Sequence, residues 1–127
     1  MKIILLMANV LIWSILAQQF FPWWIIGVVC FVTAYILKPN KFIGFSASLL
    51  AVFILWTIKV WHADSHFDVP MSGLLGGLFG NVSGSAIYFL TGLIGGLFAG
   101  LSGLLGTWTR QLSAPPSKVT TLHRQKK

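Results

Sequence analysis

The segment 42–61, FIGFSASLLAVFILWTIKVW, constrains the fold most strongly because it holds a single charged residue, Lys59. As an α-helix, a segment of this length is about 30 Å long, which matches the hydrocarbon core of a lipid bilayer. The segment is therefore predicted to cross a membrane as one helix.

Further apolar runs indicate that the chain spans the membrane several times. We predict spans over 3–19, 22–38 and 86–108, in addition to the one above. Only 9% of the residues are charged and mean hydropathy is +0.83, whereas a soluble domain carries about 25% charged residues. The run at 3–17 also has features of a secretory signal, but a second apolar run follows at once, so we predict an uncleaved hairpin. The predicted fold class is an all-α integral membrane protein with about four transmembrane helices.

The glycine- and leucine-rich segment 71–108 is too long for one span, since a helix over all of it would measure about 57 Å. The residues at 81–85, NVSGS, form a turn-like cluster that breaks it. Before the last span we therefore predict a short helix over 72–80, either interfacial or re-entrant. The two halves form an internal repeat, because 72–85 aligns with 91–104 in its order of small and large residues.

The distribution of basic residues is typical of membrane topology rather than of a nucleic-acid-binding face. The net charge of +7 is concentrated in the polar turn 38–41 and in the tail 110–127, which we predict to be disordered and cytoplasmic. Four spans place both termini in the cytoplasm, and of the basic residues only Lys59 then lies near the outer side. We thus predict a multi-pass protein of the cytoplasmic (inner) membrane, with a transmembrane domain over 1–109 and no nucleic-acid partner.

Small residues form one face of the span 86–108. At 100° per residue they lie within about 120° of arc, and bulky side chains cover the remainder. Glycine costs about 1 kcal/mol relative to alanine in a helix, so a glycine face favours tight helix packing in lipid. The packing partner is either a helix of the same chain, or a second copy or another membrane protein. The predicted packing residues are Gly92, Gly95, Gly96, Ala99, Gly103 and Gly106.

The segment 61–68, WHADSHFD, holds both acidic residues of the chain and two of its three histidines. Imidazole and carboxylate groups are ligands of zinc and other divalent ions. The same residue types are also ordinary in a wet turn between two helices, and we predict no bound metal. The residues that would be candidate ligands are His62, Asp64, His66 and Asp68.

The predicted spans contain no Asp, Glu or His, which argues against a proton-driven carrier. The sequence has no phosphate-binding loop, dinucleotide fingerprint, or haem or zinc motif, so we predict no enzymatic activity and no cofactor. Our interpretation is a small accessory or assembly subunit that packs through its glycine face, in contact with the lipid bilayer and with a partner membrane protein or further copies of itself. Two alternatives stay open: an oligomeric, holin-like pore or channel former, and a membrane protein that binds a divalent metal on its outer side.

Overall fold

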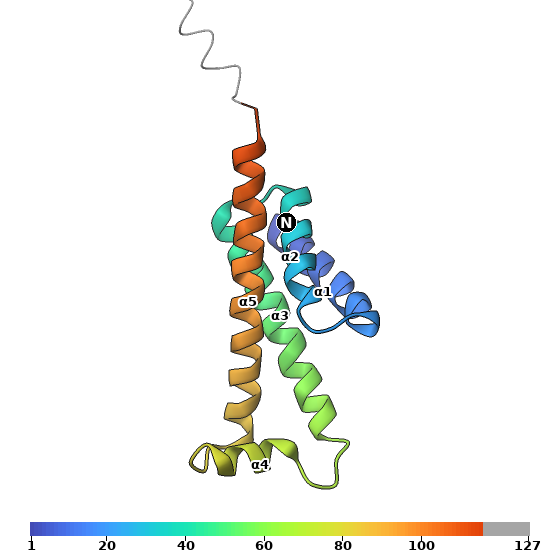
Figure 1. Ribbon diagram of the computed structural model, residues 1–127, viewed down its shortest axis with the longest axis vertical. Coiled ribbons are helices and arrows are strands. Elements are labelled where there is room, and N and C mark those ends of the chain that lie inside the picture. The colour runs from blue at the N-terminus through green and yellow to red at the C-terminus, as the bar shows by residue number, and fades with distance from the viewer. Residues whose placement is uncertain (116–127) are drawn as a thin grey trace, which may run out of the picture.

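The computed structural model describes residues 1–115, in which all regular secondary structure is helical. Figure 1 shows α5 beside α3, with the hairpin of α1 and α2 packed on this pair and α4 lying across its far end. The prediction of an all-α fold is confirmed. The helices are α1 (Lys2–Phe20), α2 (Ile25–Leu37), α3 (Lys41–Asp64), α4 (Met71–Leu78) and α5 (Gly84–Ser113).

Three helices, α1, α3 and α5, are long and apolar enough to cross a membrane. The other predicted span, 22–38, is shorter than expected, because α2 has 13 residues and is about 20 Å long. At its C-terminal end, Lys38 precedes Pro39, and a residue before proline avoids the α-helical region; Lys38 is left-handed with φ 52° and ends the helix. At its N-terminal end, the chain forms a turn after the extended Phe21, and α2 begins only at Ile25. The structure therefore supports three helices of spanning length rather than the four predicted.

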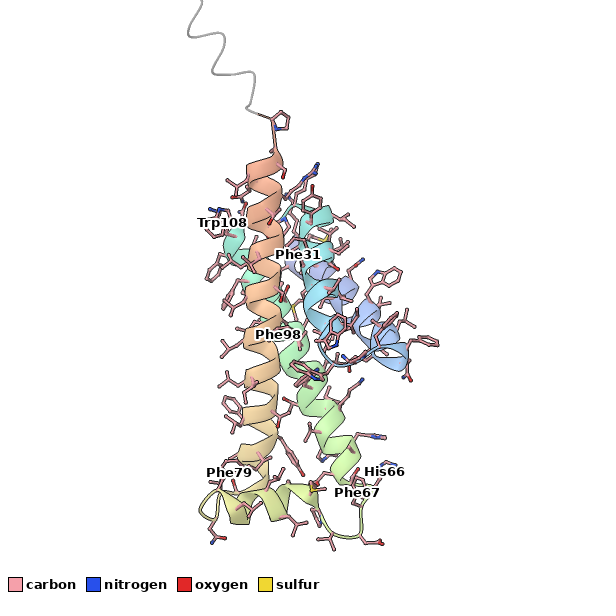
Figure 2. All side chains as sticks on the ribbon, in the orientation of Figure 1. Phe31, His66, Phe67, Phe79, Phe98 and Trp108 are labelled. Atoms are coloured by element: carbon pink, nitrogen blue, oxygen red, sulfur yellow. The ribbon has the colours of Figure 1, made fainter. Side chains whose placement is uncertain are left out.

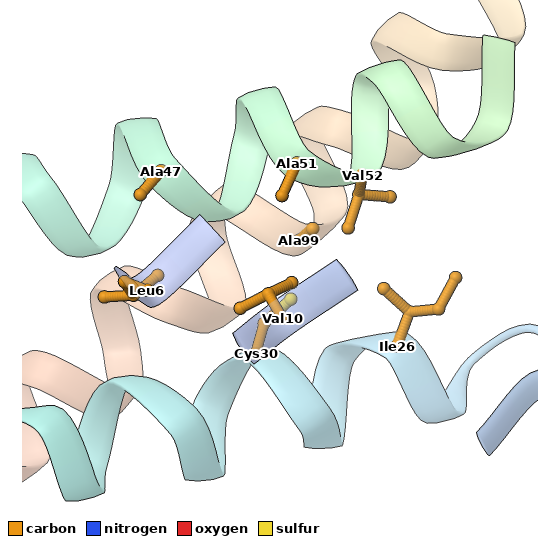
Figure 3. Close-up of a cluster of buried hydrophobic side chains, with 8 residues drawn as sticks. All are labelled: Leu6, Val10, Ile26, Cys30, Ala47, Ala51, Val52 and Ala99. Atoms are coloured by element: carbon orange, nitrogen blue, oxygen red, sulfur yellow. The ribbon is translucent and has the colours of Figure 1, made fainter. Parts of the chain in front are cut away.

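The core lies where α1, α2, α3 and α5 meet, and short side chains dominate it. Because these side chains are short, the helices approach one another closely, while large apolar side chains are left on the outer surface. A bundle surrounded by lipid is expected to be built in this way. The buried cluster in Figure 3 consists of Leu6, Val10, Ile26, Cys30, Ala47, Ala51, Val52 and Ala99.

The predicted short helix 72–80 corresponds to α4, which covers Met71–Leu78. In Figure 1 it runs crosswise to α5, beneath the ends of α3 and α5. The turn that follows uses two left-handed residues, Gly80 with φ 83° and Asn81 with φ 70°, and these residue types adopt that conformation at the lowest cost. The predicted break between the two glycine-rich halves is thus present, but it lies at 79–83, between the end of α4 and the start of α5 at Gly84, rather than at 81–85.

The last helix is longer than the predicted span 86–108. It begins at Gly84 and continues to Ser113, which makes it about 45 Å long. The first residues of the predicted tail 110–127 are therefore helical. The part of that tail from 116 onward lies outside the described residues.

Basic side chains gather at one end of the bundle. The Lys41 ammonium lies 5.6 Å from the centre of the Trp108 ring, and the Arg110 guanidinium lies 5.1 Å from that of Tyr35. The first of these cation–π contacts joins the start of α3 to the C-terminal part of α5, and the second joins the end of α2 to it. Since α3 runs the length of the bundle, Asp64 is at the opposite end, so the two ends differ in charge.

Candidate functional site

A buried carboxylate at the C-terminal end of α3 makes the densest side-chain hydrogen bonding in the described part of the chain. Asp64 is 7% exposed. Its Oδ1 accepts a hydrogen bond from the Ser72 backbone N–H at 3.1 Å. Its Oδ2 accepts one from the Ser72 hydroxyl at 2.5 Å and another from the Tyr88 hydroxyl. Because Ser72 lies in the first turn of α4 and Tyr88 near the start of α5, one carboxylate joins three helices.

These hydrogen bonds favour the charged form of Asp64, which lies beyond the apolar segment 42–61. The hydroxyls of Ser72 and then Tyr88 lower the pKa of the Asp64 carboxyl below its usual 3.8, and desolvation opposes them only in part. The charge also faces the first turn of α4, whose N–H groups have no partners within the helix. No side chain of its own caps α4, so α3 supplies the capping carboxylate.

This polar cluster fastens helices to one another. The hydroxyls of Ser72 and Tyr88 lie 3.3 Å apart, and both donate to the same carboxylate oxygen. The cluster therefore holds α4 across the ends of α3 and α5.

Of the four candidate metal ligands, only the two histidines lie together. The ring centres of His62 and His66 are 4.5 Å apart with their planes tilted by 33°, and Figure 2 shows His66 at the end of α3. Asp64 instead contacts α4 and α5, and Asp68 is exposed in the connection that follows. In the part of the chain that the structure describes, no three His, Cys, Asp or Glu side chains are grouped so that they could hold a metal ion.

The glycine face of α5 lies against neighbouring helices of the same chain. A Cβ atom at Gly96 would lie 2.9 Å from the carbonyl oxygen of Leu49, and one at Gly103 would lie 2.5 Å from that of Gly44. These distances are shorter than van der Waals contact, so the helices can approach this closely only without a side chain. The other predicted packing residues are also buried: Gly92 and Gly95 against α3, Ala99 in the core, and Gly106 against the backbone of α2.

Two glycines outside the predicted set belong to the same contact. A Cβ atom at Gly100 would lie 3.1 Å from the ring of Phe45. Gly44, on α3, faces the Thr107 hydroxyl of α5. The contact between α3 and α5 is thus lined by glycine from both helices, which the pattern of α5 alone does not indicate.

Comparison of the chain with protein-family models, with curated protein sequences and with solved structures finds no match. The function must therefore follow from the geometry of the chain itself. The Asp64 cluster and the glycine face both join helices of this chain to one another.

Proposed function

We propose that the chain is a non-enzymatic, multi-pass protein of the cytoplasmic membrane that serves as a small accessory or assembly subunit. The observation that carries this proposal is that its polar cluster and glycine face are used to pack helix on helix. Large apolar side chains cover the outer faces of its long helices, and the bilayer or another membrane helix is the environment that suits them. The protein then acts by packing its helices against other helices in the membrane.

The difference in charge between the two ends supports an orientation. Lys38, Lys41 and Arg110 are at one end, while Asp64 and Asp68 are at the other. Basic residues next to spans favour the cytoplasmic side. We therefore place the basic end and both termini in the cytoplasm, with α4 at the outer surface of the membrane. This orientation requires the 13-residue α2 to return the chain to the cytoplasmic side between α1 and α3.

A partner protein would use a surface other than the glycine face, because α3 and α2 already occupy that face. The outer faces of α1, α2 and α5 are available instead. The sequence left two packing partners open for the glycine face, a helix of the same chain or another protein, and the contacts at this face support the first.

Reporter fusions test the orientation. A reporter that is active only in the cytoplasm should be active when it is fused after residue 127. A reporter that is active only outside should be active when it is inserted at 65–68. A C-terminus on the outer side would overturn the proposed topology, because the charge difference would then point the wrong way.

Reconstitution and co-purification test the function. Dye-filled liposomes that contain the purified protein should retain their dye as well as empty liposomes do. Dye release that increases with the amount of protein would support the pore-forming alternative instead. From native membranes in mild detergent, the protein should co-purify with a second membrane protein, or with further copies of itself, in a constant ratio. Recovery as a monomer alone would contradict the accessory role.

A further inference from the structure

A groove runs along the outer side of the α1–α2 hairpin, with a volume of about 420 Å³. Most of its lining is apolar, and its rim is open: Trp13 is 55% exposed, and Val28 and Val32 are each 46% exposed. Two polar side chains lie among these apolar ones. The lining residues are Asn9, Trp13, Val28, Val29, Val32, Thr33, Ile36 and Leu37.

Within residues 1–115, the two polar side chains, Asn9 and Thr33, have no hydrogen-bond partner. Neither side chain takes part in any hydrogen bond found within residues 1–115. Thr33 is only 6% exposed. Six other helical hydroxyls differ from it, because each of these donates to the carbonyl oxygen four residues earlier: Ser46, Thr57, Thr91, Ser102, Thr107 and Thr109.

The location of Asn9 makes the lack of a partner costly. Asn9 lies about 10 Å along α1 from Lys2, in the interior of a helix long and apolar enough to cross a membrane. In hydrocarbon no water can satisfy a carboxamide, so the group needs a partner from protein. Ser14 and Ser48 also lack partners, but both are fully buried inside the bundle, whereas Asn9 borders an open groove.

We propose that this groove is the interface of a two-fold dimer in the membrane, in which the Asn9 carboxamides of two copies hydrogen-bond to each other. A carboxamide carries both a donor and an acceptor, so its simplest complement is a second carboxamide. A two-fold axis brings the same residue of each copy together. The lining contains no charged residue, so nothing in it selects a charged partner. Asparagine is known to join membrane helices by hydrogen bonds of this kind.

The apolar rim supports the same arrangement. Trp13, Val28 and Val32 surround the polar pair and would be covered by the equivalent residues of the second copy. The glycine face does not compete for this role, because helices of the same chain occupy it. The dimer rests on the proposed membrane insertion, and the experiment below separates the failure of one from the failure of the other.

Energy transfer between donor- and acceptor-labelled full-length protein in phosphatidylcholine liposomes tests the dimer. The wild type should dimerise as the protein-to-lipid ratio rises. Asn9→Leu should lower the association constant about tenfold, which corresponds to about 1.4 kcal/mol. Asn9→Gln keeps the carboxamide and should restore most of the association. Thr91→Val is the control, because its hydroxyl bonds within α5, and it should associate like the wild type.

Flotation of the same liposomes distinguishes the possible failures. Protein that does not float with lipid would overturn the membrane proposal itself. Protein that floats but stays monomeric at every ratio would overturn the dimer alone and would leave the groove to lipid chains or a different helix. Equal association of wild type and Asn9→Leu, with helicity unchanged by circular dichroism, would also overturn it.

A cysteine cross-linking experiment keeps the test decisive if Asn9→Leu does not fold. In a Cys30→Ala background, Val32→Cys on the rim of the groove should yield dimers with a short thiol cross-linker. Ile94→Cys, which is 60% exposed on the outer side of α5, should yield none. Cross-linking at Ile94→Cys but not at Val32→Cys would move the interface to α5 and contradict the proposal.

Discussion

Replacement of Gly103 by alanine should destabilise the bundle although alanine is the better helix former. The new Cβ atom would lie 2.5 Å from the carbonyl oxygen of Gly44 and 3.0 Å from Cβ of Ser48. A close carbon–oxygen contact between helices measures about 3.3–3.6 Å, so α3 and α5 would have to separate locally by about 1 Å. Neither obstacle can rotate away, because one is backbone and the other is the first atom of a side chain.

The expected change in the free energy of unfolding follows from two opposing effects. Overpacking of a close-packed site typically costs about 1–3 kcal/mol, and the rigid neighbours of Gly103 favour the upper part of that range. The gain in helix propensity from glycine to alanine offsets about 1 kcal/mol. The net loss for Gly103→Ala should be about 2 kcal/mol, and Gly103→Leu should lose more.

The exposed α4 helix provides a matched control. A Cβ atom at Gly77 meets nothing within 4 Å, so Gly77→Ala should gain up to about 1 kcal/mol. The assay is the free energy of unfolding in mixed micelles, with helicity followed by circular dichroism as the denaturing detergent fraction rises. Both substitutions replace glycine by alanine, yet Gly103→Ala should lower the free energy of unfolding and Gly77→Ala should raise it. Equal stability of the two variants would show that the contact between α3 and α5 is not the tight one described above.

Three further outcomes are expected. Because the folded-state pKa of Asp64 is lowered from 3.8, the fastening of α4 is fully present above pH 3.8 and is lost as the pH falls through the lower folded-state value. The mobility of a spin label on α4 should report this loss, and Tyr88→Phe should move it to higher pH. Changing His62 and His66 together to alanine should leave thermal stability unchanged; specific zinc binding in calorimetry that this change abolishes would contradict the separation of the ligands. Leu101→Ala should cost less than about 1 kcal/mol in the micelle assay, because Leu101 is 55% exposed and lipid or detergent fills the vacated space.

Hydropathy predicted the long helices well, because apolar content and length are local properties of a segment. It did not predict the shortness of α2, which begins at Ile25 and ends at Leu37, before the left-handed Lys38 and Pro39. The predicted span 22–38 includes the turn at 22–24 and the helix end at Lys38, so composition alone overestimates the helix.

The internal repeat shows a limit of local patterns. Gly77 and Gly96 occupy equivalent places in the two copies, yet Gly77 faces open space while Gly96 lies against the Leu49 carbonyl oxygen. The difference comes from α3, which packs along α5 but does not pack along α4. A glycine pattern therefore predicts that a helix can be approached closely, and the rest of the fold decides whether it is.

The Asp64 cluster was missed because its members are far apart in the sequence, and because the helix was predicted to end at residue 61. The structure continues α3 through Asp64. On a helix, residues two apart do not share a face, so Asp64, the last residue of α3, points away from His62. His66 lies in the turn after the helix, with its Nδ1 2.8 Å from the His62 carbonyl oxygen. With the correct helix end, the separation of Asp64 from His62 would have been predictable, although the partners of Asp64 would not.

Whether polar groups have hydrogen-bond partners distinguishes the inner surfaces of this bundle from the outer ones more clearly than glycine content does. Glycine is abundant on α5, but that face is already filled by helices of the same chain. Asp64 has its donors, and six helical Ser and Thr hydroxyls donate to their own helix. Within residues 1–115, Asn9 and Thr33 border an open groove without a hydrogen-bond partner. Because a polar group in hydrocarbon must find a partner in protein, the α1–α2 hairpin, rather than the glycine-rich helix, is the surface from which assembly is expected to proceed.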